Sequence, residues 1–136
     1  MEWTEKAPEY GDIVRTKVSF YYHYGIFVNE NRIIQFGLPD NVNRPADEVK
    51  VLATDIYTFI GKGELEVAEL SASEKAKRRK PKQAVALAES RIGEGGYNIL
   101  HNNCEHFVYD CVLGEKNSDF ISNLRKNLRK KLGKND

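Results

Sequence analysis

The hydrophobic pattern of this 136-residue chain changes period near its middle, and the change limits the folds that the chain can adopt. Residues up to 69 favour short strands, at 12–15, 23–29, 32–36, 49–53 and 64–69, with a helical turn from 55. Apolar residues at helical spacing then predict helices at 84–92 and 104–112. The polar pair Glu30-Asn31 suits a tight hairpin, so we expect 23–29 and 32–36 to be adjacent antiparallel strands.

Breaker and capping residues set the limits of the predicted helices. Pro81 precedes the first helix and Gly93 follows it, while Gly114 ends the second. Ser118 can cap a third, basic and amphipathic helix at 121–136, whose apolar stripe is Ile121, Leu124, Leu128 and Leu132. We expect residues 71–82 to form a mobile connection.

Length and composition predict one domain that spans residues 1–136. The chain is 40% hydrophobic and 30% charged, as in ordinary soluble proteins. Its first residues lack the pattern of a secretion signal, and it has no run of eighteen apolar residues, so we expect a cytoplasmic protein. On one helix, Cys104 and Cys111 would have Cα atoms about 10.5 Å apart, too far for a disulfide. Reduced thiols fit the same compartment.

The small net charge of +1 conceals two cationic segments. Residues 74–82 and 121–136 each carry six basic residues and one acidic residue, which leaves nine basic and eighteen acidic residues elsewhere. Such segments favour peripheral binding to an anionic membrane, although a solvated loop and a solvated helix face would have the same composition. Nucleic acid is not an expected partner, because no aromatic residues are interleaved with the charges. We expect a monomer.

The motif with the clearest chemistry is Asn102-Asn103-Cys104-Glu105-His106-Phe107. Its thiol, together with the distant His23, suggests a nucleophile and a general base. The asparagines would place Cys104 at the start of a helix, where free N–H groups and the helix dipole lower the pKa of a thiol.

Two segments resemble the signature boxes of a known family. Residues 103–107 resemble the NCEHF box, and residues 23–28 resemble the H-W-A-I-Y-V box, of the lecithin:retinol acyltransferase-like proteins and their H-Ras-like suppressor relatives. The resemblance covers about residues 8–120. It implies an α+β fold of the permuted NlpC-type, papain-like class, in which a small antiparallel sheet carries the histidine and packs on helices, one of which carries the cysteine.

The resemblance also implies roles for individual residues. Cys104 would be the nucleophile, His23 the base, and Gln35 the partner that orients His23. Many relatives have a second histidine in place of Gln35, but an amide oxygen can also accept the imidazole N–H. Tyr21 matches a tyrosine near the oxyanion. On the α-helix His106 points away from Cys104, so we expect it to be structural.

The implied function is thiol-dependent acyl transfer or hydrolysis, of phospholipase A type, through a Cys104 thioester. The expected substrate is a phospholipid or another acyl ester. A cysteine peptidase or amidase would use the same pair of residues, and a non-catalytic interaction module could retain both boxes. We expect no cofactor and no metal, since the spacing of the remaining candidate ligands fits no common zinc pattern; these are His101, Cys104, His106 and Cys111.

Overall fold

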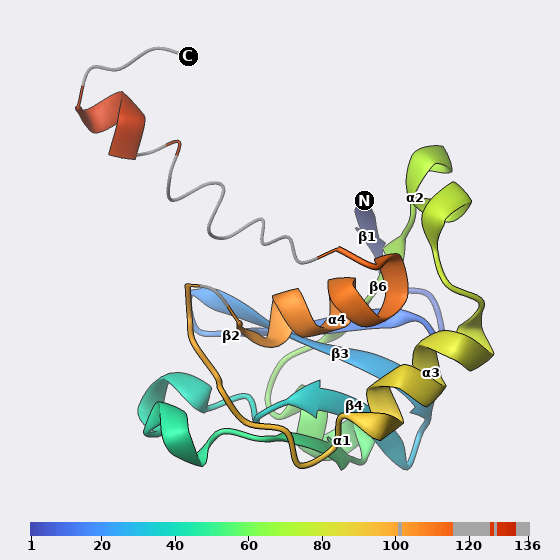
Figure 1. Ribbon diagram of the computed structural model, residues 1–136, viewed down its shortest axis with the longest axis horizontal. Helices are drawn as coiled ribbons and strands as arrows, with labels where there is room; N and C mark the ends of the chain where they lie inside the picture. Colours follow the sequence, from blue (N-terminus) through green and yellow to red (C-terminus); the bar gives the residue numbers. More distant parts are fainter. Residues whose placement is uncertain (101, 116–125, 127, 133–136) are drawn as a thin grey trace.

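The computed structural model describes residues 1–100, 102–115, 126 and 128–132. Its centre is one antiparallel sheet with the strand order β1-β6-β2-β3-β4-β5 (Figure 1). The strands are β1 (Glu2–Thr4), β2 (Ile13–Val18), β3 (Tyr21–Asn29), β4 (Arg32–Phe36), β5 (Val51–Thr54) and β6 (Leu65–Glu69). The predicted α+β class, with a small antiparallel sheet packed on helices, is confirmed.

Most strands lie where the alternation of the sequence predicted them. The bounds of β4 are those predicted, and β3 begins two residues earlier than expected. Strand β1 was not predicted, because three residues are too few to show an alternating pattern. The loop after β4 contains two short 3₁₀ turns, η1 (Asn41–Asn43) and η2 (Ala46–Glu48).

Four helices complete the described fold: α1 (Ile56–Ile60), α2 (Ala72–Lys77), α3 (Pro81–Ser90) and α4 (Cys104–Leu113). Helix α2 lies within the segment predicted to be a connection. Ser71 and Glu74 form a reciprocal capping box at its start, and this pair is the sequence signal that could have predicted the helix. Gly114 ends α4 in the left-handed conformation, as expected.

The two faces of the sheet have separate hydrophobic cores. Helices α3 and α4 pack on the face that carries Ile26, Ile34 and Phe36. Phe59 of α1 packs on the opposite face, against residues such as Ile33. Because side chains alternate along a strand, His23 and Gln35 fall on the α1 face, and the rings of His23 and Phe59 are 5.3 Å apart.

The C-terminal helix predicted at 121–136 lies mostly outside the described residues. Residues 126 and 128–131 are helical, and Leu128 and Leu132 are 51% and 70% exposed. Ser118, Ile121 and Leu124 are not among the described residues. Within the described part of the chain, no helix is long and apolar enough to cross a membrane.

Candidate active site

Helix α4 begins at Cys104 because Asn103 caps it. The Asn103 Oδ1 atom accepts hydrogen bonds from the backbone N–H groups of Glu105 and His106, both at 3.0 Å. In return, the Asn103 N–H donates to Nδ1 of His106 at 3.0 Å. The predicted helix start is therefore confirmed, and His106 has a structural role in the cap.

The start of α4 meets the sheet where β3 and β4 separate. Their ladder runs from Asn29 opposite Arg32 to Gly25 opposite Gln35, and β4 then continues alongside β5. The backbone N–H of Tyr24, the next residue of β3 beyond this ladder, faces the sulfur of Cys104. The thiol thus adjoins the residue that directly follows His23.

The orientation of Gln35 is determined by its partners on the α1 face. Its Nε2 atom donates to the carbonyl of Ile33 at 3.0 Å and to Oγ1 of Thr54 at 2.8 Å. The Thr54 hydroxyl donates in turn to the carbonyl of Asp55 at 3.1 Å. Since a carbonyl can only accept, the amide nitrogen must face Ile33 and Thr54, and Oε1 must face His23.

This orientation assigns the tautomer of His23. Gln35 Oε1 lies 2.9 Å from His23 Nε2, so Nε2 carries the proton. The Nδ1 atom then has a free lone pair. It is buried and has no hydrogen-bond partner among the described residues. General base catalysis requires such a nitrogen within hydrogen-bond reach of the thiol. The His23 side chain lies on the α1 face and α4 packs on the opposite face, so the pairing of His23 with Cys104 stays a prediction.

Burial controls the ionisation of both groups. Desolvation lowers the pKa of His23 to about 4, against the opposing effects of the Gln35 hydrogen bond, the Asp40 charge and the Gly37 carbonyl. Desolvation raises the pKa of Cys104 to about 12, and the N–H groups around the sulfur reduce this increase only in part. The expected low pKa of the thiol is therefore wrong, because burial outweighs the helix start. At neutral pH both groups are uncharged.

Tyr21 lies near Cys104, but its hydroxyl is engaged elsewhere. Burial raises the pKa of Tyr21, and the nearby Cys104 and Asp40 raise it further. The Tyr21 hydroxyl donates a short hydrogen bond to the carbonyl of Pro39. Tyr21 thus holds the loop after β4 against β3, and its role at an oxyanion stays a prediction.

Three residues near the site were missed in the sequence. Thr54 orients Gln35, and Asp40 lies close enough to influence the pKa of His23. Tyr97 has a raised pKa, caused by burial and then by the nearby Cys104, and its ring contacts that of Phe36 at 5.2 Å. No local motif links these positions to the cysteine, so only the folded chain brings them together.

Cys111 lies two turns along α4 and is fully buried. Its sulfur is 3.7 Å from Nη1 of Arg91, and both cysteines are free thiols.

Among the described residues, no group of three or more side chains could hold a metal ion. His101, one of the candidate ligands considered above, is not described.

Comparison with known proteins places most of this chain in one family. The lecithin retinol acyltransferase family model matches residues 6–117. The chain is 28% identical to lecithin retinol acyltransferase of Mus musculus over 126 residues, covering 78% of this chain and 54% of the relative. It is 28% identical to the Homo sapiens protein over 124 residues, covering 76% and 54%. The chain spans about half the length of these curated relatives. On the extent of the family match, this chain belongs to the lecithin retinol acyltransferase family.

Proposed function

We propose that this protein is a thiol-dependent acyltransferase or hydrolase that acts on phospholipid esters through a thioester on Cys104. One observation carries the proposal: the Gln35 amide orients His23 and leaves its buried Nδ1 without a partner among the described residues, while the Cys104 sulfur meets the backbone of Tyr24, the next residue of β3. The family match supports the acyl chemistry, and the name of the relatives refers to lecithin.

In the first step, His23 Nδ1 takes the proton of the Cys104 thiol as the sulfur attacks the ester carbonyl carbon. The backbone N–H of Cys104 at the helix start faces the sulfur and is suited to stabilise negative charge on the substrate oxygen. The tetrahedral intermediate then breaks its C–O bond. The imidazolium returns its proton to the departing alcohol oxygen, which leaves the acyl group on sulfur.

In the second step, an acceptor hydroxyl or amine attacks the thioester, and His23 Nδ1 removes its proton. The acceptor then carries the acyl group, and the proton returns to the thiolate. His23 is 0% exposed and Cys104 is 6% exposed, so the site is shielded from bulk water. This shielding favours transfer to an amine or hydroxyl over hydrolysis.

The test is intact-protein mass spectrometry after incubation with phosphatidylcholine vesicles. We expect one fatty acyl group on the protein, absent in Cys104→Ala and present in Cys111→Ala, which removes the other thiol of the same helix. Rapid removal of the group by hydroxylamine would identify a thioester. Absence of the adduct, combined with turnover of a peptide amide, would replace this proposal with the amidase alternative.

A further inference from the structure

The turn between β2 and β3 exposes a phenylalanine without a structural need for it. Val18 pairs with Tyr21, so the turn has two residues, Ser19 and Phe20. Ser19 has φ of 58°, a conformation that favours asparagine or glycine. Phe20 is 76% exposed. Residue types that do not suit their local conformation or their exposure to water are characteristic of functional positions.

A second apolar tip lies just before the catalytic helix. Asn98 and Asn102 form an antiparallel bridge, which closes a tight loop around Ile99 and Leu100. These two residues are 49% and 47% exposed. The Asn103 side chain donates to the Ile99 carbonyl at 2.8 Å, so the residue that caps α4 also holds this loop.

Both tips adjoin the Cys104 end of α4. Phe20 stacks edge-on against Tyr21 at 5.5 Å, and Tyr21 lies close enough to Cys104 to influence ionisation. Tyr97, from the chain leading to the second tip, is affected by both Tyr21 and Cys104. In Figure 1 the β2–β3 turn and the segment before α4 lie at the same end of the molecule.

The two tips are also free of charge. Residues 18–22 and 96–100 contain no Asp, Glu, Lys or Arg, although 30% of the chain is charged. They combine tyrosine and asparagine with phenylalanine, isoleucine and leucine. Side chains of this kind suit the boundary between lipid head groups and acyl chains, because this region is apolar on one side and hydrated on the other.

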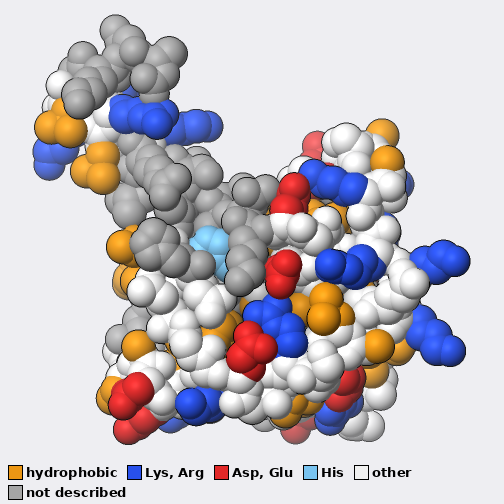
Figure 2. All heavy atoms as spheres, viewed as in Figure 1, with side chains coloured by type: hydrophobic (Ala, Val, Ile, Leu, Met, Phe, Trp, Pro, Cys, Tyr) orange, Lys and Arg blue, Asp and Glu red, His pale blue; other side chains and the backbone are white. Residues whose placement is uncertain are grey.

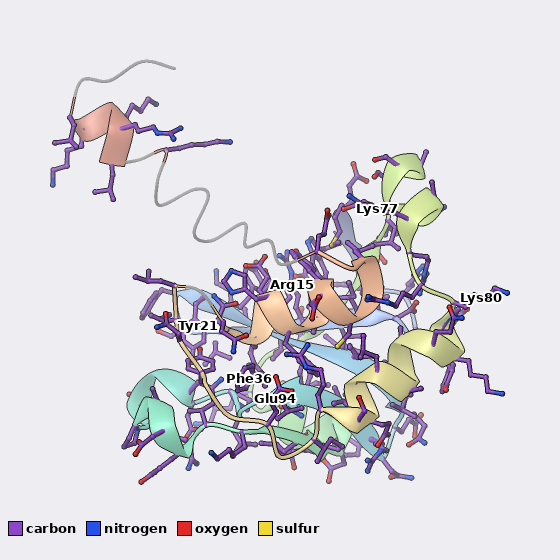
Figure 3. The ribbon with its side chains drawn as sticks, viewed as in Figure 1. Arg15, Tyr21, Phe36, Lys77, Lys80 and Glu94 are labelled. Atoms are coloured by element: carbon purple, nitrogen blue, oxygen red, sulfur yellow. The ribbon has the colours of Figure 1, made fainter. Side chains whose placement is uncertain are left out.

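The basic segment at 74–82 is located at the other end of α4. Arg79 donates to the carbonyl of Cys111, and Lys77 pairs with Glu115 at 2.8 Å. A ten-residue helix places that end about 14 Å from Cys104. Figure 3 shows Tyr21 far from Lys77 and Lys80, and Figure 2 shows blue side chains along the α2 and α3 edge. Electrostatic docking through this segment would not present Cys104 to a membrane.

We infer that the apolar rim, defined as Phe20, Ile99 and Leu100, inserts into the surface of a phospholipid layer with electrically neutral head groups. The inference rests on the proposed function, since the lipid at that surface is the acyl donor. Insertion of the rim brings an ester group to the end of α4 that carries Cys104. Binding depends on apolar contact, so it persists at high salt.

The binding test uses the full chain in the Cys104→Ala background, so that turnover does not consume the lipid. Sedimentation with phosphatidylcholine vesicles is measured for this protein and after adding Phe20→Ser or Leu100→Ser. We expect each rim substitution to lower the partition coefficient about tenfold, because a large apolar side chain no longer leaves water. The matched control is Tyr57→Ser, an 81% exposed aromatic residue on α1, which should have no effect.

A second measurement uses the active protein and compares turnover on vesicles with turnover on a monomeric short-chain ester. Rim substitutions should lower the ratio of the two rates, and Tyr57→Ser should leave it unchanged.

The inference is overturned if rim variants sediment like the parent, if Tyr57→Ser has an equal effect, or if charge reversal at Lys80 and Lys82 alone abolishes binding. It is also overturned if the rim variants change the mass of the lipid-free protein, since a second copy then covers the rim. Failure of the proposed function gives a different result, namely rim-dependent binding without an acyl adduct.

Discussion

Replacing Gln35 by leucine removes the acceptor of the His23 Nε2–H proton while keeping a side chain of similar size. Both residues are 0% exposed, so water cannot replace the lost partner. The substitution also removes the amide donor to Ile33 and Thr54. His23 is then free to rotate or to place its proton on Nδ1, where it can no longer act as the base.

The size of the effect follows from the lost hydrogen bond. Leaving a buried polar group without its partner costs about 1–3 kcal/mol. The bond strengthens when the imidazole becomes charged, so a similar amount is lost in the transition state. At about 1.4 kcal/mol per factor of ten, we expect acylation to slow about 5- to 150-fold in Gln35→Leu. His23→Ala removes the base itself and should slow it by about 10²–10⁴.

Gln35→His is the matched variant, because it restores an acceptor. One nitrogen of the new imidazole can accept from His23, and the other can donate to Thr54 or Ile33. It should recover most of the rate at neutral pH and lose it in acid, where protonation of the new ring removes the acceptor. In the parent protein the pKa of His23 is about 4, so the base stays neutral and the acylation rate stays level from about pH 5 to neutral pH.

The assay is the rate of acyl transfer to Cys104, followed by intact mass from pH 4.5 to 8, with urea unfolding as the control for stability. Full activity in a folded Gln35→Leu protein would refute the role of the amide. Equal loss in Gln35→Leu and Gln35→His would show that side-chain shape, and not the acceptor, is what matters.

Four further outcomes are expected. Cys104→Ala should abolish turnover and Cys111→Ala should keep most of it; equal loss in folded proteins would contradict the choice of nucleophile. His23→Ala should reduce the acylation rate more than His106→Ala, which removes a helix-capping acceptor and is expected to lower the melting temperature instead. Because the pKa of His23 is about 4 in the folded state and about 6.5 when unfolded, its stabilising contribution is complete above pH 6.5 and is lost as the pH falls towards 4. That loss is about 3 kcal/mol in urea unfolding, and His23→Gln should not show it. Thr54→Val should slow acylation while Thr54→Ser should preserve it, since serine retains the hydroxyl that accepts from the Gln35 amide.

The sequence alone determined the local elements of the site. Alternation predicted β4 with its observed bounds, and the even spacing of twelve residues agrees with His23 and Gln35 sharing a face. The asparagine before Cys104 predicted the helix start. These features depend on residues within a few positions of one another, or on the strict two-residue period of a strand, so they can be inferred without knowing the packing.

The tertiary structure decided the properties that depend on distant segments. The sign of the Cys104 pKa shift follows from burial, which outweighs the local effect of the helix start. Thr54 is nineteen residues from Gln35, yet it orients the amide, and the carbonyl of Pro39 accepts the hydrogen bond of the Tyr21 hydroxyl. The basic segment at 74–82 lies at the far end of α4 because Arg79 binds the carbonyls there. Burial and long-range contacts arise from the packing of the whole chain, and no short stretch of sequence contains them.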